Sequence, residues 1–357
     1  MKYNAEEAIA LLRHLIATPS FSREEDATAS ILYEWLSERD ASPQRFKNNV
    51  WAMAGEYDPS KPTLMLNSHH DTVRPSASYT RDPFEPAVED DHLYGLGSND
   101  AGASVVSLAT AFLELRREKL PFNLLLALTA AEEVMAPDGM RAFLPEMKRL
   151  GIRIDMALVG EPTGMAPAIA ERGLLVLDGV ARGVAGHAAR NEGVNAIYKA
   201  IEAIERLRSF SPERVSDVLG PIKVSVTQIE AGRQHNVVPD ECRFVVDVRT
   251  TDAYTNETTA EMLAATAGCE LVARSTRVHA SVIPLEHPLV KAAMELGREP
   301  FVSPTTSDMA LMHSIPSLKM GPGRSERSHS ANEFVLLSEI RSAIPVYISI
   351  IKSISLP

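Results

Sequence analysis

The sequence predicts an α/β protein with a smaller α+β domain inserted into it. In the first half of the chain, apolar runs of strand length alternate with segments of helical periodicity, as expected of β-α-β units around a buried sheet. After about residue 173 the runs become rich in valine and leucine and alternate in part, which suits a sheet with helices on one face. The length of 357 residues also favours two cores. We therefore expect one domain from residues 1–172 and 284–357, and an inserted domain over residues 173–283.

The composition is that of a globular protein without a nucleic-acid-binding face. Apolar residues make up 45% and charged residues 23% of the chain, and the formal net charge of −11 argues against a basic binding surface. The two cysteines, Cys242 and Cys269, have no CxxC spacing, which excludes a disulfide framework and argues against a thiolate zinc site. The sequence shows neither a signal-peptide pattern nor a run of membrane-span length, so we expect a soluble cytoplasmic protein.

The elements of the first domain follow from capping residues and apolar periodicity. Asn4 can cap a first helix whose stripe includes Leu11 and Leu15, and Thr18-Pro19-Ser20 ends that helix. Short apolar runs bounded by turn residues read as strands. The predicted helices span residues 4–15, 24–39, 103–118 and 338–351, and the predicted strands span residues 49–54, 63–67, 123–129 and 155–160.

Polar residues directly follow the strand predicted at 63–67. His69 and Asp71 are two residues apart, so the carboxylate can orient the imidazole ring of the histidine toward a metal. A hydrogen-bonded His-Asp pair that closes a loop explains the same pattern. This stretch by itself leaves both interpretations open.

Two further strands also end in acidic residues. Glu132 and Glu133 follow the strand at 123–129, and Glu161 follows the strand at 155–160. Asp100 lies in a glycine-rich run, and His329 lies in a polar loop before the last helix. Because ligands gather at the carboxyl ends of strands in α/β sheets, we expect one shared site there. Two imidazoles with several carboxylates form the donor set of a zinc pair, in which one carboxylate bridges the metals.

The inserted domain carries its own strands and helices. Its strands are expected to form one sheet with helices on one face. The predicted strands span residues 174–183, 223–229, 243–249 and 271–278, and the predicted helices span residues 195–210 and 255–267.

The order of these motifs resembles that of the dinuclear-zinc amidohydrolases, which include acetylornithine deacetylase, succinyl-diaminopimelate desuccinylase, aminoacylase and glutamate carboxypeptidase. The resemblance spans nearly the whole chain. It implies a phosphorylase/hydrolase-like three-layer α/β/α catalytic domain with a ferredoxin-like dimerisation domain. It rests on His69-His70-Asp71-Thr72-Val73, the glycine-rich run that reaches Asp100, Glu132-Glu133, Gly160-Glu161-Pro162-Thr163, Gly186-His187-Ala188-Ala189, Asn236-Val237-Val238-Pro239, Asp247-Val248-Arg249 and His329.

The resemblance also implies a role for each residue of the expected site. Asp100 bridges two Zn²⁺ ions in each subunit, for which Co²⁺ can substitute, and Glu132 is the general base. Asp71 orients a metal-bound histidine. One metal is completed by His69 and Glu161, and the other by Glu133 and His329.

Three residues of the inserted domain match family positions that act on the substrate. His187 is expected to reach into the site of a partner subunit and stabilise the oxyanion, which implies a homodimer formed through the inserted domain. Arg249 and Asn236 match positions that hold the carboxylate end of the substrate. Taken alone, His187 suits an ordinary glycine-rich turn and Arg249 an exposed strand.

The resemblance implies hydrolysis of the amide bond of an N-acyl amino acid. Length and the segment from Gly321-Pro322-Gly323 to Ser328-His329 place the chain nearest the acetylornithine deacetylases, so N-acetylornithine and arginine biosynthesis are the first expectation. The alternatives are deacylation of N-succinylornithine or N-acetylcitrulline, desuccinylation of succinyl-diaminopimelate, and dipeptide hydrolysis. A non-catalytic dimeric binding protein and a purely structural cation site are the alternatives from other classes. His70 is expected to be structural.

Overall fold

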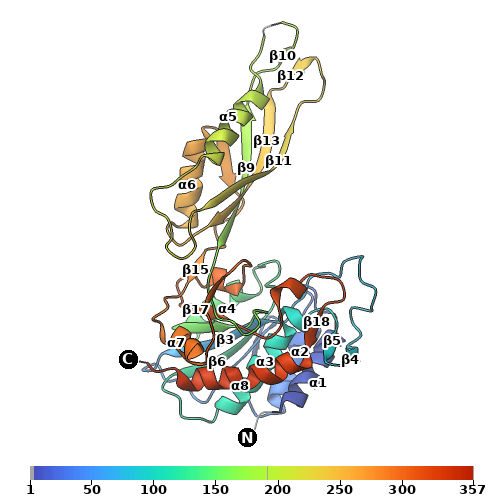
Figure 1. The fold of residues 1–357 in the computed structure, drawn as a ribbon, viewed down its shortest axis with the longest axis vertical. Coiled ribbons are helices and arrows are strands. Elements are labelled where there is room, and N and C mark those ends of the chain that lie inside the picture. The colour runs from blue at the N-terminus through green and yellow to red at the C-terminus, as the bar shows by residue number, and fades with distance from the viewer. Residues whose placement is uncertain (1–3, 191, 357) are drawn as a thin grey trace. The chain divides into compact units, whose positions relative to one another are not determined.

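The computed structural model describes residues 4–190 and 192–356. The chain divides into two compact units (Figure 1). The first unit comprises Met1–Ile169, Ile283–Phe301 and Ser307–Pro357, and the second comprises Ala170–Val282 and Val302–Thr306. In the described part of the chain, no helix combines the length and apolarity needed to cross a bilayer.

The first unit is built on a mixed sheet whose strand order is β1-β2-β6-β3-β7-β17-β8. The central pairs β6/β3, β3/β7 and β7/β17 are parallel, whereas β2 runs antiparallel to β6. Its strands are β1 (Gln44–Phe46), β2 (Asn49–Met53), β3 (Thr63–His69), β6 (Asn123–Thr129), β7 (Met156–Val159), β8 (Ala168–Glu171), β16 (Phe301–Ser303) and β17 (Ser317–Lys319).

Helices cover both faces of this sheet and produce three layers. Alternate residues of β3 enter opposite cores: Leu64 and Leu66 pack with the helices α1, α3 and α8, whereas Met65 packs with α4. α3 and α8 lie side by side (Figure 1). The helices are α1 (Ala5–Ile16), α2 (Asp26–Ser37), α3 (Ala103–Leu115), α4 (Met140–Arg149), α7 (Pro288–Glu295) and α8 (Leu337–Ser353), with short turns η1 (Ser98–Gly102), η2 (Asp308–Leu311) and η3 (Ser325–Arg327).

The second unit contains an antiparallel sheet of order β11-β13-β9-β14. β9 buries alternate residues against α5 and α6, as one covered face requires (Figure 1). The predicted α/β class, with a separate α+β unit built on an antiparallel sheet, is therefore confirmed. The elements of this unit are β9 (Gly173–Arg182), β10 (Gly186–His187), α5 (Ala196–Arg208), β11 (Lys223–Ala231), β12 (Val237–Val238), β13 (Glu241–Thr250), α6 (Asn256–Ala267), β14 (Glu270–Ala273) and β15 (Ser281–Val282).

Several elements differ from the sequence prediction. The strand predicted over 271–278 is β14, which ends at Ala273; Val278 makes only a single bridge to Leu174. The helix α4 was not predicted, although Met140, Phe143 and Met147 have helical spacing and are buried. A small sheet of β4 (Val88–Glu89), β5 (His92–Tyr94) and β18 (Phe334–Leu336) was also missed. Its strands are two or three residues long and come from distant parts of the chain, so local periodicity is weak.

Candidate metal centre

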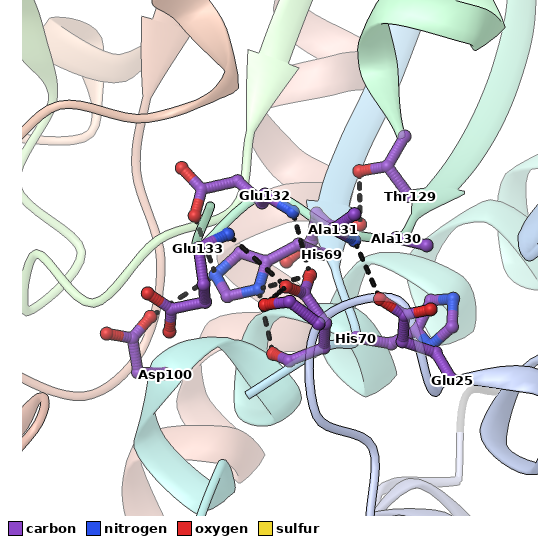
Figure 2. Close-up of polar contacts among 12 residues, drawn as sticks. Glu25, His69, His70, Asp100, Thr129, Ala130, Ala131, Glu132 and Glu133 are labelled. Atoms are coloured by element: carbon purple, nitrogen blue, oxygen red, sulfur yellow. Dashed lines mark hydrogen bonds and ion pairs between the residues drawn. The ribbon is translucent and has the colours of Figure 1, made fainter. Parts of the chain in front are cut away.

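The candidate site lies at the carboxyl ends of the parallel strands of the first unit. His69 is the last residue of β3 and pairs with Thr129, the last residue of β6. Glu132 and Glu133 follow β6, and Glu161 follows β7. Parallel pairing in register brings these side chains to one edge of the sheet, and Figure 2 shows the two glutamates and Asp100 gathered around His69.

His69 faces three carboxylates. Its Nε2 atom lies 3.3 Å from Asp100 Oδ1, 3.7 Å from Glu161 Oε1 and 4.0 Å from Glu132 Oε2. The other ring nitrogen, Nδ1, lies 3.1 Å from the backbone oxygen of Asp71. A proton on Nδ1 donates to that oxygen, so the neutral ring carries on Nε2 the lone pair that a metal ligand requires. Burial opposes a charged ring, but hydrogen bonds to Asp100 and Asp71 outweigh burial and raise the pKa of His69 well above its ordinary value.

Asp100 also faces a second histidine. Its Oδ2 atom lies 3.6 Å from Nε2 of His329, which lies 2.9 Å from Glu133 Oε2. The two oxygens of Asp100 therefore face two different imidazoles. Ligand atoms of His69, Asp100 and Glu133 all lie within 4.8 Å of one another. This donor set fits a pair of divalent cations that share Asp100.

Asp71 supports the site from behind. Its Oδ1 atom accepts the backbone N–H of Glu132 at 3.0 Å, and its Oδ2 atom accepts that of Glu133 at 3.2 Å and the hydroxyl of Ser22 at 2.7 Å. Burial opposes its ionisation, but interactions with His69 and these donors outweigh burial and hold the pKa of Asp71 below its ordinary value. The ionised carboxylate therefore fixes the backbone that carries both glutamates.

The crowding of carboxyl groups shifts their ionisation. Burial, with nearby acids, raises the pKa of Glu132 well above its ordinary value and that of Glu161 to about 8. Burial also raises the pKa of Glu133. The hydrogen bond to Glu133 raises the pKa of His329 to about 9. Bound cations would favour the ionised carboxylates and the neutral imidazole, so the site suits metal chemically.

Three polar residues around the site were not predicted from the sequence. Glu333 is buried and accepts the backbone N–H groups of Asn99 and Asp100, each at 2.9 Å. Burial raises the pKa of Glu333 to about 8. Asp308 is buried as well and accepts the hydroxyl of Thr129 at 2.8 Å; burial raises its pKa to about 6. Asn99 could have been predicted from its position directly before Asp100. Glu333 and Asp308 belong to no sequence motif that would have indicated a place in the site.

His70 points into a different environment from His69. Its Nδ1 atom lies 3.0 Å from the hydroxyl of Thr28, and its Nε2 atom lies 2.9 Å from the backbone oxygen of Asn48. Burial lowers the pKa of His70, which favours the neutral ring. Both ring nitrogens thus serve the packing of α2 and the loop before β2.

The second unit brings together two of the three residues expected to act on the substrate. His187 is exposed on β10, and the N–H of Ala188 donates to the backbone oxygen of Asn236 at 3.0 Å. Arg249 lies near the other end of β13, roughly 26 Å of extended strand from Glu241. Its guanidinium pairs with Asp247 at 2.8 and 3.2 Å, so it is not beside the other two.

The family model that matches this chain is described as Peptidase family M20/M25/M40, and it covers residues 65–353. The chain belongs to this family. It is 30% identical to the succinyl-diaminopimelate desuccinylase of Dinoroseobacter shibae over 97% of this chain and 98% of the relative. It is 28% identical to that of Cereibacter sphaeroides strain KD131, with the same coverage of 97% and 98%.

Solved structures share the fold. A tripeptidase from Staphylococcus aureus has a TM-score of 0.77 at 20% identity and covers 98% of each chain. The YXEP protein of Bacillus subtilis, described as a dinuclear metal-binding peptidase of the M20 family, has a TM-score of 0.73 at 20% identity and covers 97% of each chain. The expectation of a metal-dependent hydrolase is confirmed by family membership.

The finer assignment from the sequence is corrected by these relatives. Length and the segment from Gly321 to His329 predicted a place nearest the acetylornithine deacetylases and in arginine biosynthesis. Relatives at 28–30% identity over nearly the whole chain are named desuccinylases of succinyl-diaminopimelate instead. The segment from Gly321 to His329 carries less weight, because it covers nine residues, whereas these relatives match over hundreds.

Proposed function

We propose that this protein hydrolyses the amide bond of an N-succinyl amino acid of the succinyl-diaminopimelate type. The names of relatives at 28–30% identity over 97% of the chain support this substrate class. The reaction type is carried by one observation: the two oxygens of Asp100 face His69 and His329, with Glu132 alongside.

Two zinc ions, which cobalt can replace, are the proposed cofactor. His69, Asp100 and Glu161 would hold one ion, and Asp100, Glu133 and His329 the other. When bound, such ions polarise the amide carbonyl and make the attacking water more acidic.

Glu132 is the proposed general base. It is buried, and its carboxylate makes no hydrogen bond to another side chain among the residues that the structure describes. Its N–H is held by Asp71, which fixes the backbone from which the side chain projects. A buried carboxylate with a raised pKa suits taking a proton from the attacking water and giving it to the departing amine.

His187 is proposed to donate a hydrogen bond to the developing oxyanion in the site of a partner subunit. Its Nδ1 atom accepts the N–H of Ala189 at 3.1 Å, which places the proton of the neutral ring on Nε2. That exposed N–H is then available as a donor. The proposal includes a homodimer formed through the second unit, and a carboxylate-binding role for Asn236. Arg249 stays proposed for the same role, which it could fill only after releasing Asp247.

Mixed subunits test the shared site. Inactive Glu132→Gln and inactive His187→Ala proteins are combined under conditions of subunit exchange. Some activity should return, because one hybrid site receives both intact residues. No recovery despite demonstrated exchange would contradict the shared site.

The substrate is tested by steady-state turnover of the zinc- or cobalt-loaded protein. The panel is succinyl-diaminopimelate, N-succinylornithine, N-acetylornithine, N-acetylcitrulline and a dipeptide. We expect the highest kcat/KM for succinyl-diaminopimelate. N-Acetylornithine is the second candidate, favoured by Gly321-Pro322-Gly323 and Ser328-His329. Higher kcat/KM for an acetyl substrate or a dipeptide would replace the proposed substrate class.

A further inference from the structure

A succinyl group carries a second carboxylate, which needs a positively charged partner in an otherwise acidic site. Three arginines lie in loops of the first unit next to metal-site residues: Arg74, Arg324 and Arg327. The structure distinguishes them by what their guanidinium groups already bind. Arg74 lies 2.7 Å from Glu24 and stacks over Phe21 at 4.4 Å.

Arg327 is also engaged. Its Nη1 atom lies 2.7 Å from Glu339, and its guanidinium stacks over Phe334 at 4.5 Å. The side chain is only 16% exposed. Arg327 thus connects the loop that carries His329 to α8 and β18, and its charge is already paired with that of Glu339.

Arg324 has an exposed side chain with a free guanidinium. Across residues 4–190 and 192–356, its side chain makes no hydrogen bond, ion pair or ring contact. Arg324 is therefore the one of the three whose charge remains available to a ligand.

The backbone of Arg324 is held firmly beside the metal centre. Its N–H donates to Asn99 Oδ1 at 2.9 Å, and its carbonyl accepts from Asn99 Nδ2 at 3.1 Å. It also forms a single antiparallel bridge with Thr163. Asn99 directly precedes Asp100, and Thr163 follows Glu161 by two residues. The guanidinium is thus free while its attachment point is fixed between two loops that carry proposed metal ligands.

We propose that Arg324 binds the terminal carboxylate of the substrate's succinyl group and so sets acyl specificity. This inference rests on the proposed function. A guanidinium binds a carboxylate through two parallel hydrogen bonds, which an acetyl group cannot accept. The α-carboxylate of the amino acid is the other possible source of the same chemistry, and substrates that lack one carboxylate or the other separate the two.

The test compares N-succinylornithine with N-acetylornithine, which share their amine half. In Arg324→Gln, kcat/KM for the succinyl substrate should fall by about 10- to 100-fold, the loss expected for charged hydrogen bonds, whereas the acetyl substrate should change by less than about threefold. Arg74→Gln removes the same charge from an arginine already paired with Glu24, and it should leave the ratio of the two substrates unchanged.

Equal losses for both substrates in Arg324→Gln would overturn the proposal. A loss that disappears when the α-carboxylate is replaced by an amide would overturn it too, by assigning Arg324 to that carboxylate. Succinate binding to the zinc-loaded protein, measured by calorimetry, separates this proposal from the proposed function. If no succinyl substrate turns over but succinate binding weakens in Arg324→Gln and acetate binding does not, the substrate assignment fails and the carboxylate subsite stands. Succinate binding that is unchanged in Arg324→Gln would overturn the subsite.

Discussion

Replacement of Asp71 by asparagine tests how the metal centre is held together. The carboxylate accepts the N–H groups of Glu132 and Glu133 on different oxygens, and the hydroxyl of Ser22. Asparagine keeps one oxygen and has an amide NH2 group, a hydrogen-bond donor, in place of the other. Whichever way the amide lies, one backbone N–H then faces another N–H donor.

The structure sets the size of the effect. A buried donor left without an acceptor costs about 1–3 kcal/mol. His69 keeps the backbone oxygen of Asp71 at 3.1 Å as an acceptor, so its orientation survives in part. We therefore expect metal affinity to fall by about 10-fold, near the low end of the 10–100-fold range for such supporting residues. Turnover at saturating zinc should fall further, because the backbone of Glu132 loses its anchor.

Competition with a chelator measures the metal dissociation constants, and turnover at saturating zinc measures the effect on catalysis. Ser22→Ala is the matched control, because it removes one donor to Asp71 but keeps the carboxylate. It should lower the free energy of unfolding by only about 1 kcal/mol. The reasoning is refuted if Asp71→Asn binds zinc as tightly as the wild type and turns over within about threefold of it, since both losses were expected from the unpaired N–H.

Three further predictions concern the base, the protons and the loop of the metal centre. Glu132→Gln should keep its metal content but lose about 10²–10⁴-fold in turnover, and a near-normal rate would remove the general-base role. In the metal-free protein Glu161 and His329 hold protons at pH 7, because their pKa values are about 8 and about 9. The pKa of His69 is also raised well above its ordinary value, because hydrogen bonds to Asp100 and Asp71 outweigh the opposing effect of burial. Calorimetry in buffers of different ionisation enthalpy should therefore detect release of at least two protons on metal binding, with affinity rising as the pH increases toward 9; binding without proton release would contradict this. Gly323→Ala should lower the free energy of unfolding by about 1–3 kcal/mol, because φ is +82° and the new Cβ would lie 2.3 Å from an amide oxygen. Gly151→Ala, at φ +74° with open space around it, is the control for the backbone term, and equal losses in chemical denaturation would show that the close contact costs nothing.

Much of the candidate site could be predicted because it follows a local rule. His69, Glu132 and Glu161 each come directly after an apolar strand, and parallel strands bring such positions to one edge of the sheet. Asn99 and Glu333 could not be found in this way. Asn99 binds Arg324 across 225 positions, and Glu333 binds the N–H of Asp100 across 233. Nothing in the local pattern of either residue specifies such a distant partner.

The sequence by itself determined most of the strands and helices and the residues placed at the strand ends, since these depend on periodicity and capping over a few positions. Only the tertiary structure decided how these side chains are used. The two oxygens of Asp100 face different histidines. Arg74 pairs with Glu24 and Arg327 pairs with Glu339, whereas the guanidinium of Arg324 is free among the described residues. The physical reason is that charge pairing depends on which segments meet in space, and spacing along the chain does not specify this: Arg74 and Glu24 are 50 positions apart, and Arg327 and Glu339 are 12 apart.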